Sequence, residues 1–308
     1  MTTALFTHPA CFAHDVGEWH PECPDRLRYV LRALEAEEFA PLLRELAPLA
    51  TPEQLWLVHP ADYVASILAI TPTDGGRVML DADTGMSAGS AEAALRSAGG
   101  AIAAVDAVME GWARNAFVAT RPPGHHAEAA QAMGFCLFAN AAIAARHAQA
   151  RWGLTKIAVV DFDVHHGNGT QAIFEADATL FYGSSHQYPC YPGTGAPSER
   201  GVGNVVNVGL PPGSDGMAFR GAWQHILLPA LEAFAPDLLI VSAGFDAHIA
   251  DPLAQLRVRT PDFVWLTEQL LAVAERNCSG RLVSVLEGGY DLDALAEASA
   301  AHVRALMR

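Results

Sequence analysis

The chain has 308 residues, of which 51% are hydrophobic, and its formal net charge is −15. This hydrophobic content suffices for a large core, and the acidic charge without a basic run argues against direct nucleic-acid binding, which needs clustered lysine and arginine. The five cysteines show no CxxC spacing, and no segment has the pattern of a signal peptide or a membrane span. We therefore expect a reduced, cytoplasmic protein without a membrane partner.

The first 75 residues have less regular patterns than the rest. Residues 24–39 predict an amphipathic helix whose acidic residues come late, and residues 52–68 predict a helix in two pieces. We find no linker composition and no repeat, so we expect a single domain over residues 1–308.

From about residue 100 onward, short apolar runs alternate with helical patterns. The runs are rich in β-branched residues and apolar on both faces, which is typical of buried parallel strands. The alternation predicts an α/β fold with a central, mostly parallel sheet flanked by helices. The predicted strands are 116–120, 156–162, 179–185, 204–210, 237–244 and 281–289, and the predicted helices are 88–111, 137–152, 217–234, 261–277 and 291–307.

Polar side chains follow four of these predicted strands. Ligands bind beyond the carboxyl ends of the strands in an open parallel sheet, so these residues are expected to meet at one edge. Residues of a solvated loop would instead scatter over both edges. The residues concerned are His125 and His126; Asp161, Asp163, His165 and His166; Asp246 and Asp251; and Tyr290.

Asp163 and His165 are spaced as a metal-binding pair. Residues i and i+2 at the end of a strand point the same way, so a carboxylate and an imidazole can meet one ion there. Asp246, after another strand, would supply a third ligand. Such an open site without cysteine suits Zn²⁺ or Fe²⁺ in a catalytic role, and the alternative is a hydrogen-bonded polar turn.

The other two groups of polar residues suit acid–base chemistry and oxyanion binding. His125 and His126 follow two prolines and Gly124, and histidine transfers protons readily near neutral pH. Tyr290 follows two glycines that let the backbone approach a ligand, and its hydroxyl could donate to an oxyanion. Taken alone, the alternatives are two surface histidines and an ordinary turn tyrosine.

Several motifs together resemble the zinc-dependent histone deacetylase superfamily. They are "HPECPDRL", "RPPGHHAE", "DFDVHHGNGTQAIF", "YPGTG", "SAGFDAHIADPL" and "LEGGYDL", in that order over residues 20–295. The likeness is greatest to the class II branch and to bacterial deacetylase-like amidohydrolases, some of which act on acetylpolyamines. It implies an arginase-like three-layer α/β fold, in agreement with the strand pattern, and hydrolysis of Nε-acyl-lysine by zinc-activated water.

The resemblance also implies roles for particular residues. Asp163, His165 and Asp246 would bind zinc, and His126 would act as general base and then as general acid beside its electrostatic partner His125. These roles come from the positions of the residues in the family's motifs. The zinc ion could be replaced by Fe²⁺ in the cell.

Three more motif residues complete the implied catalytic set. Asp161 would orient His125, Asn168 would contact His126, and Tyr290 would be the catalytic tyrosine. Class I members have aspartate where Asn168 stands, whereas class II members resemble this chain. Asparagine accepts the imidazole N–H without adding charge, so it raises the histidine pKa less than aspartate would. His166 receives no catalytic role, and we expect it to form structural hydrogen bonds.

The resemblance implies a narrow acyl-lysine tunnel and a potassium ion. Phe135 and Tyr191 would form the aromatic walls, although tyrosine is a departure from the usual phenylalanine at the second wall. The other expected substrate-binding residues are Gly134, Leu253 and Gly289. The structural K⁺ would lie near Asp161, Asp163, His165 and Ser184.

Other functions remain open from the sequence. The substrate could be an acetylated polyamine, although Leu253 stands where one polyamine-selective branch has glutamate. A ureohydrolase would need more carboxylates for a second metal ion than these loops offer. A non-catalytic acyl-lysine binding module is disfavoured because the catalytic positions are intact. The sequence does not determine the oligomeric state.

Overall fold

The computed structural model describes residues 2–73 and 75–308 and shows a central sheet of eight parallel strands. The order across the sheet is β2-β1-β5-β10-β9-β6-β7-β8, and the separate β3 and β4 form a small antiparallel pair. The bounds are β1 Thr3–Thr7, β2 Leu43–Leu46, β3 Val78–Met79, β4 Gly85–Met86, β5 Asn115–Val118, β6 Ile157–Asp161, β7 Leu180–Gln187, β8 Val205–Leu210, β9 Leu238–Ala243 and β10 Leu282–Leu286.

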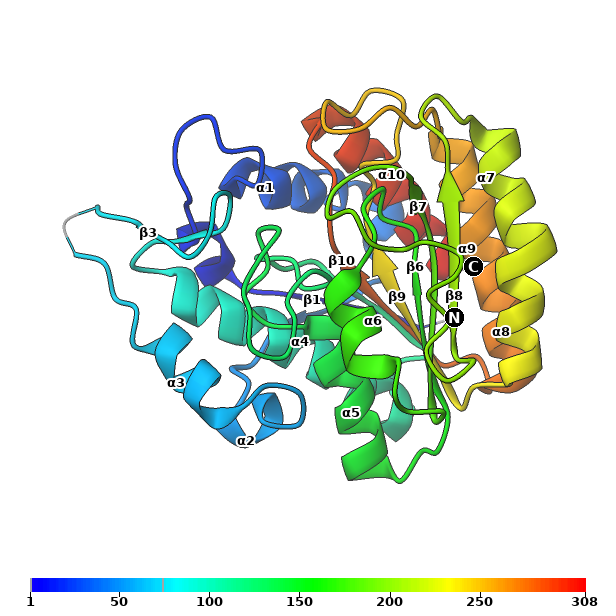
Figure 1. The fold of residues 1–308 in the computed structure, drawn as a ribbon, viewed down its shortest axis with the longest axis horizontal. Coiled ribbons are helices and arrows are strands. Elements are labelled where there is room, and N and C mark those ends of the chain that lie inside the picture. Colours follow the sequence, from blue (N-terminus) through cyan, green and yellow to red (C-terminus); the bar gives the residue numbers. More distant parts are fainter. Residues whose placement is uncertain (1, 74) are drawn as a thin grey trace.

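Helices cover both faces of this sheet, which gives three layers (Figure 1). One layer contains α1, α7, α8, α9 and α10, and the opposite layer contains α4 and α5. The α-helix bounds are α1 Pro24–Ala33, α2 Pro52–Leu55, α3 Ala61–Leu68, α4 Ser90–Glu110, α5 Asn140–Trp152, α6 Asn168–Phe174, α7 Gly216–Ala222, α8 Leu228–Phe234, α9 Thr260–Asn277 and α10 Leu292–Leu306. Within the described residues, no helix is both long and apolar enough to cross a membrane.

Successive residues of the central strands point to opposite faces of the sheet and pack in two separate hydrophobic cores. In β9, Leu239 and Val241 face the α9 and α10 side, whereas Leu238 and Ile240 face the α4 and α5 side. Because both faces are covered by helices, the central strands are mostly apolar on both sides, as the sequence indicated. The predicted α/β architecture with a parallel sheet is therefore confirmed.

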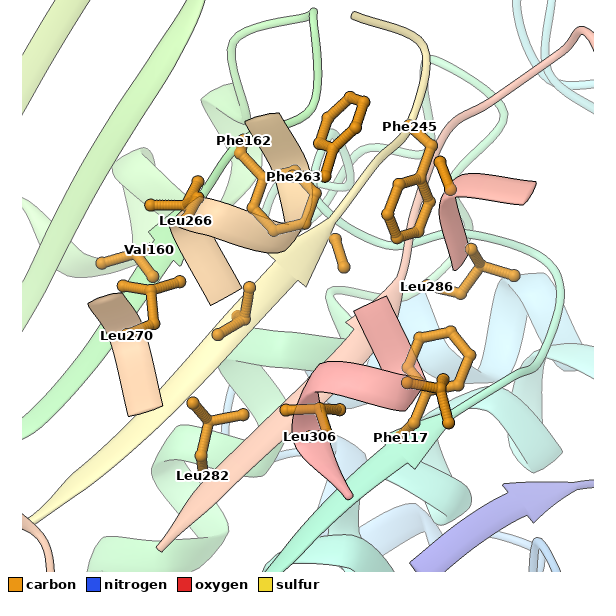
Figure 2. Packing of buried hydrophobic residues seen from close by; sticks show 14 of the residues in the cluster. Phe117, Val160, Phe162, Phe245, Phe263, Leu266, Leu270, Leu282, Leu286 and Leu306 are labelled. Atoms are coloured by element: carbon orange, nitrogen blue, oxygen red, sulfur yellow. The ribbon is translucent and has the colours of Figure 1, made fainter. Parts of the chain in front are cut away.

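An aromatic cluster lies just below the carboxyl edge of the sheet. Figure 2 shows Phe162 and Phe245, from the loops after β6 and β9, beside Phe263 of α9. Their ring centroids are 5.4 to 5.7 Å apart. Burial of each phenylalanine contributes roughly 1.5–3 kcal/mol. Phe162 and Phe245 directly precede Asp163 and Asp246, so this packing fixes the backbone that presents both aspartates.

Several elements differ from the sequence prediction. The helix predicted over residues 24–39 ends at Ala33, because the acidic residues that follow are unfavourable at a helix C-terminus. The predicted helix 217–234 contains one π-helical turn, Trp223–Leu227, between α7 and α8. Strands β1 and β2 and helix α6 were not predicted. Residues 52–68 form two helices, α2 and α3, as expected.

The topology places four loops at one edge of the sheet. The strands before these loops are β5, β10, β9 and β6, which are consecutive across the centre of the sheet although they are distant in the chain. The chain passes from β5 to β6 and returns later to insert β9 and β10 between them. Such a reversal of strand order is where open α/β sheets bind ligands.

Candidate active site

Three buried side chains form a cluster that could hold a metal ion. One ligand atom from each of Asp163, His165 and Asp246 lies within 4.8 Å of the other two. The Nδ1 atom of His165 is 3.2 Å from Oδ1 of Asp163 and 3.1 Å from Oδ2 of Asp246. Two carboxylates and one imidazole suit a divalent transition metal, so the residues fit the expected ion.

Backbone amides hold the carboxylates of this cluster. Gly288 N donates to Oδ2 of Asp163 at 2.8 Å, and Val164 N donates to Oδ1 of Asp246 at 2.8 Å. A Cβ atom at Gly288 would lie 2.2 Å from Oδ2 of Asp246, so only glycine lets the backbone approach both aspartates. These contacts orient the carboxylates before any ion binds.

The cluster has electrostatic reasons to bind a cation. Burial and the neighbouring Asp163 raise the pKa of Asp246 to about 7. Burial would also raise the pKa of Asp163, but His125 and His165 lower it well below its usual range. Two carboxylates enclosed at such short range repel one another, and a divalent cation between them would relieve that repulsion.

The tandem histidines after β5 have different partners. The Nδ1 atom of His125 lies 3.0 Å from Oδ2 of Asp161, and the Nδ1 atom of His126 lies 2.8 Å from Oδ1 of Asn168. The Nδ2 atom of Asn168 donates to Oε1 of Glu128 at 2.9 Å. The Oδ1 atom of Asn168 is therefore an acceptor, so His126 carries its proton on Nδ1 and leaves Nε2 as a base.

The pKa values of the two histidines are shifted in opposite directions. Burial alone would lower the pKa of His125, but Asp163 and Asp161 raise it to about 10. Burial and the neighbouring His125 and His165 lower the pKa of His126 well below its usual value. The pair thus combines a cationic His125 with a neutral His126, which is the form that a general base requires.

A cavity of about 220 Å³ opens onto His126 and His165. The rings of Phe135 and Tyr290 are 5.8 Å apart, and the rings of His126 and Tyr191 are 5.1 Å apart. A narrow aromatic space of this kind suits a linear alkyl chain. The lining residues are Asp83, His126, Gly134, Phe135, His165, Tyr191, Leu253 and Tyr290.

Gly134 and Phe135 form a tight turn against the loop of the tandem histidines. Both residues have positive φ angles, 55° and 68°. A Cβ atom at Gly134 would lie 2.4 Å from Cδ2 of His126, so this position requires glycine. The amide of Phe135 donates to Oγ1 of Thr84 at 3.0 Å, which fixes the wall of the cavity.

Tyr290 is held from both sides. Its amide donates to Oδ2 of Asp251 at 2.7 Å, and the guanidinium of Arg26 lies 4.8 Å from its ring centroid. Burial raises the pKa of Tyr290 well above its ordinary value, although Arg26 opposes this effect. The phenol therefore stays protonated at neutral pH and can donate a hydrogen bond into the cavity.

The remaining sequence-predicted residues lie close to this site but outside the cavity. Asp161 and Ser184 are partners in the β6–β7 register, and Oγ of Ser184 lies 2.9 Å from Nδ1 of His186. Gly289 is absent from the residues that line the cavity, and its carbonyl accepts a hydrogen bond from Nε of Arg26 at 2.6 Å. The two ring nitrogens of His166 lie 2.8 Å from Oγ1 of Thr194 and 2.9 Å from Oε1 of Gln171, and its structural role stays a prediction.

Three residues near the site received no role from the sequence. Asp83 lines the cavity, Arg26 lies beneath Tyr290, and the buried Glu287 accepts hydrogen bonds from the loop of the tandem histidines. Arg26 and Glu287 belong to the motifs "HPECPDRL" and "LEGGYDL", so membership in these motifs could have indicated that they lie near the site. Asp83 stands in no such motif and depends on the loop around β3 and β4.

Comparisons with known proteins show the family to which the chain belongs. The histone deacetylase domain matches residues 20–306, and the chain belongs to that family. The chain is 43% identical to the histone deacetylase-like amidohydrolase of Pseudomonas aeruginosa over 94% of its own length and 81% of the relative's. It is 39% identical to histone deacetylase 14, chloroplastic, of Arabidopsis thaliana, with 98% and 76% of the two chains covered.

A solved structure shares the fold. The HDA15 HD domain superposes with a TM-score of 0.92 at 36% identity, covering 99% of this chain and 88% of that one. A further relative, the probable deacetylase of Archaeoglobus fulgidus, is 38% identical over 95% of this chain and 82% of its own. These relatives support a hydrolase of the deacetylase and amidohydrolase type, in a family that is generally metal-dependent.

Proposed function

We propose that this chain is a zinc-dependent deacetylase that removes acetyl or other short acyl groups from Nε-acyl-lysine. The observation that carries the proposal is the convergence of three kinds of group on one narrow cavity. They are His165 of the metal-binding cluster, the neutral His126 and the protonated Tyr290. The aromatic walls would enclose the lysine side chain, and its amide would reach the inner end.

The side chains divide the chemistry between them. A zinc ion held by Asp163, His165 and Asp246 would supply Lewis-acid activation of water and of the amide carbonyl. The Nε2 atom of His126 would take the proton of the attacking water and later give it to the departing amine. The hydroxyl of Tyr290 would stabilise the negative oxygen that forms in the transition state.

Two neighbouring groups keep His126 ready for these steps. Asn168 holds its Nδ1 proton, so Nε2 faces the reaction as the base. The charged His125, fixed by Asp161, lowers the pKa of His126 and strengthens it as the later proton donor. Acetate or another short acid and the free lysine amine would be the products.

An acetylated polyamine is a second candidate substrate. Asp83 lines the cavity, and its carboxylate would attract a free ammonium group on the part of the substrate that stays outside the walls. The chain as a whole also carries a strongly negative net charge. Both features suit a cationic substrate, whether the cation is on a polyamine or on a peptide.

We further propose a structural potassium ion near Asp161, Asp163, His165 and Ser184. The adjacent positions of Asp161 and Ser184 in the sheet support it, because oxygen ligands suit hard cations. Zinc is proposed over Fe²⁺ as the catalytic ion. A cytoplasmic location, an acyl-lysine peptide partner and the absence of a nucleic-acid or membrane partner remain predictions from the sequence.

The test is a turnover panel on enzyme loaded with a single known metal. Acetyl-lysine peptides, longer acyl-lysine peptides and N-acetylputrescine would be compared by kcat/KM with Zn²⁺ and with Fe²⁺. The proposal expects the highest kcat/KM on a short acyl-lysine peptide. A preference for N-acetylputrescine would favour the second candidate, and no turnover of any amide would refute both.

A further inference from the structure

Glu287 is a buried carboxylic acid that the proposed reaction does not use. It directly follows β10, and its side chain is fully enclosed. Its Oε2 atom accepts hydrogen bonds from the amides of Gly124 at 2.7 Å and His125 at 3.1 Å. Its Oε1 atom accepts the hydroxyl of Ser242, in β9, at 3.0 Å. One side chain therefore connects the ends of β5, β9 and β10.

The backbone around Glu287 extends this connection to the other catalytic groups. The Glu287 amide donates to Ala243 O at 2.9 Å, and its carbonyl accepts a hydrogen bond from Nη2 of Arg26. The next amide, of Gly288, donates to Asp163. Arg26 in turn lies under the ring of Tyr290. The same short segment thus contacts a metal-binding residue and the support of the tyrosine.

The loop of the tandem histidines has a different anchor on its other side. Thr170 N, in α6, donates to the carbonyl of His125 at 3.2 Å. The contacts with Glu287 secure the amides of Gly124 and His125 in the same loop. Without them, the two amides would be buried and unpaired, and a loop with unpaired buried amides moves to find other partners.

A buried carboxyl in this position is costly. Burial raises the pKa of Glu287 to about 7, although the nearby His125 opposes the shift. An apolar side chain of similar size at this position would leave the amides of Gly124 and His125 and the hydroxyl of Ser242 without these acceptors. The acceptor atoms are what an apolar residue could not supply.

We propose that Glu287 is a positioning residue that sets the placement of His126 relative to Tyr290 across the cavity. It acts by pairing the amides of Gly124 and His125 and so fixing the loop that carries the base. The expected kinetic consequence rests on the proposed function. The anchoring of the loop does not, so it has a readout of its own.

Two variants whose side chains are similar in length to glutamate test the role of the Glu287 carboxyl oxygens as acceptors. Glu287→Gln keeps an oxygen for both amides and can donate to Ser242, whereas Glu287→Met keeps the bulk without acceptors. We expect Glu287→Gln to retain kcat within about threefold and Glu287→Met to lose about 100-fold, since a displacement near 1 Å costs that much. KM and zinc content should change little in either variant.

Hydrogen exchange of the loop supplies the second readout. The amides of Gly124 and His125 should exchange faster in Glu287→Met than in the wild type, and Glu287→Gln should restore their protection. If wild-type enzyme turns over no amide but exchange responds in this way, the anchor is supported and the proposed function fails. Unchanged exchange in Glu287→Met would overturn the anchor, whatever the activity.

A further variant covers the case in which Glu287→Met does not fold. Glu287→Asp keeps the carboxyl group but withdraws its oxygens by about 1.5 Å, one C–C bond. Like Glu287→Met, it should have a lower kcat and faster exchange of these amides than the wild type. A cooperative thermal unfolding transition would show that the variant is folded. A folded Glu287→Asp enzyme with wild-type kcat and wild-type protection would refute the inference.

Discussion

The Nδ1 atom of His126 lies 2.8 Å from Oδ1 of Asn168, and Asn168 in turn donates to Glu128 at 2.9 Å. The second contact fixes the orientation of the asparagine amide, and the amide fixes the proton of the imidazole. The tautomer of His126, the proposed base, therefore depends on Glu128, two residues further along the chain.

This chain of contacts predicts how a charge at position 168 changes the pH dependence. In the double variant Asn168→Asp with Glu128→Gln, the new carboxylate accepts the His126 proton while the glutamine donates to it. An adjacent negative charge raises the histidine pKa, so the acid limb of kcat/KM should move to higher pH by about one unit or more. The Glu128→Gln single variant is the control, and an acid limb that does not move would contradict the assignment of His126.

Removal of either proposed reacting side chain should lower kcat. We expect losses on the order of 10²-fold or more for His126→Ala, which lacks the base, and for Tyr290→Phe, which lacks the oxyanion donor. Steady-state kinetics on an acetyl-lysine peptide measure both. Tyr290→Phe keeps the ring over Arg26, so its thermal stability should stay near wild type. Near wild-type turnover in either variant would show that the roles are wrong.

Removal of the metal should change stability as well as activity. Asp163 and Asp246 are buried together, and a bound cation stabilises the folded state by mass action. Chelation should therefore abolish turnover and lower the melting temperature, and Zn²⁺ should restore both. Asp163→Asn should bind less zinc and show a smaller response to chelation. Equal melting temperatures with and without Zn²⁺ would argue against an ion at this cluster.

The core histidine His302 predicts a loss of stability in acid. Its Nδ1 lies 2.7 Å from Oγ1 of Thr267, its Nε2 lies 2.9 Å from Oγ of Ser284, and burial lowers its pKa from 6.5 to about 3. Between these two pH values the unfolded chain binds a proton that the folded protein excludes. Stability contributed by the neutral ring is therefore present above pH 6.5 and declines as the pH falls toward 3.

Replacement of His302 by glutamine removes this contribution to the pH dependence. Between about pH 6 and 4, the unfolding free energy of His302→Gln should fall less steeply than that of the wild type, by up to about 1.4 kcal/mol per pH unit. Denaturant titrations at several pH values measure the slopes. His225→Gln, at an exposed position, provides the matched control for the substitution itself. Equal slopes for all three proteins would contradict a neutral His302.

The sequence by itself determined the parallel sheet and the residue types at its carboxyl edge. Apolar runs of strand length and helical periodicity are local signals, because burial on both faces leaves a strand no polar side. The same local reading indicated that Asp163 and His165 would point together. It did not find β1 and β2, which are short, and β2 is exposed along its length.

Only the tertiary structure decided which distant residues support the site. Glu287 reaches Gly124 because the strand order brings β5 and β10 together, although more than 150 residues separate them. Arg26, in α1, reaches Tyr290 because α1 packs against α10, from the other end of the chain. Asp83 enters the cavity through the loop between β3 and β4. Hydrogen bonds and charge effects act over a few ångströms in space, so their partners follow from strand order and loop packing rather than from any local pattern of residues.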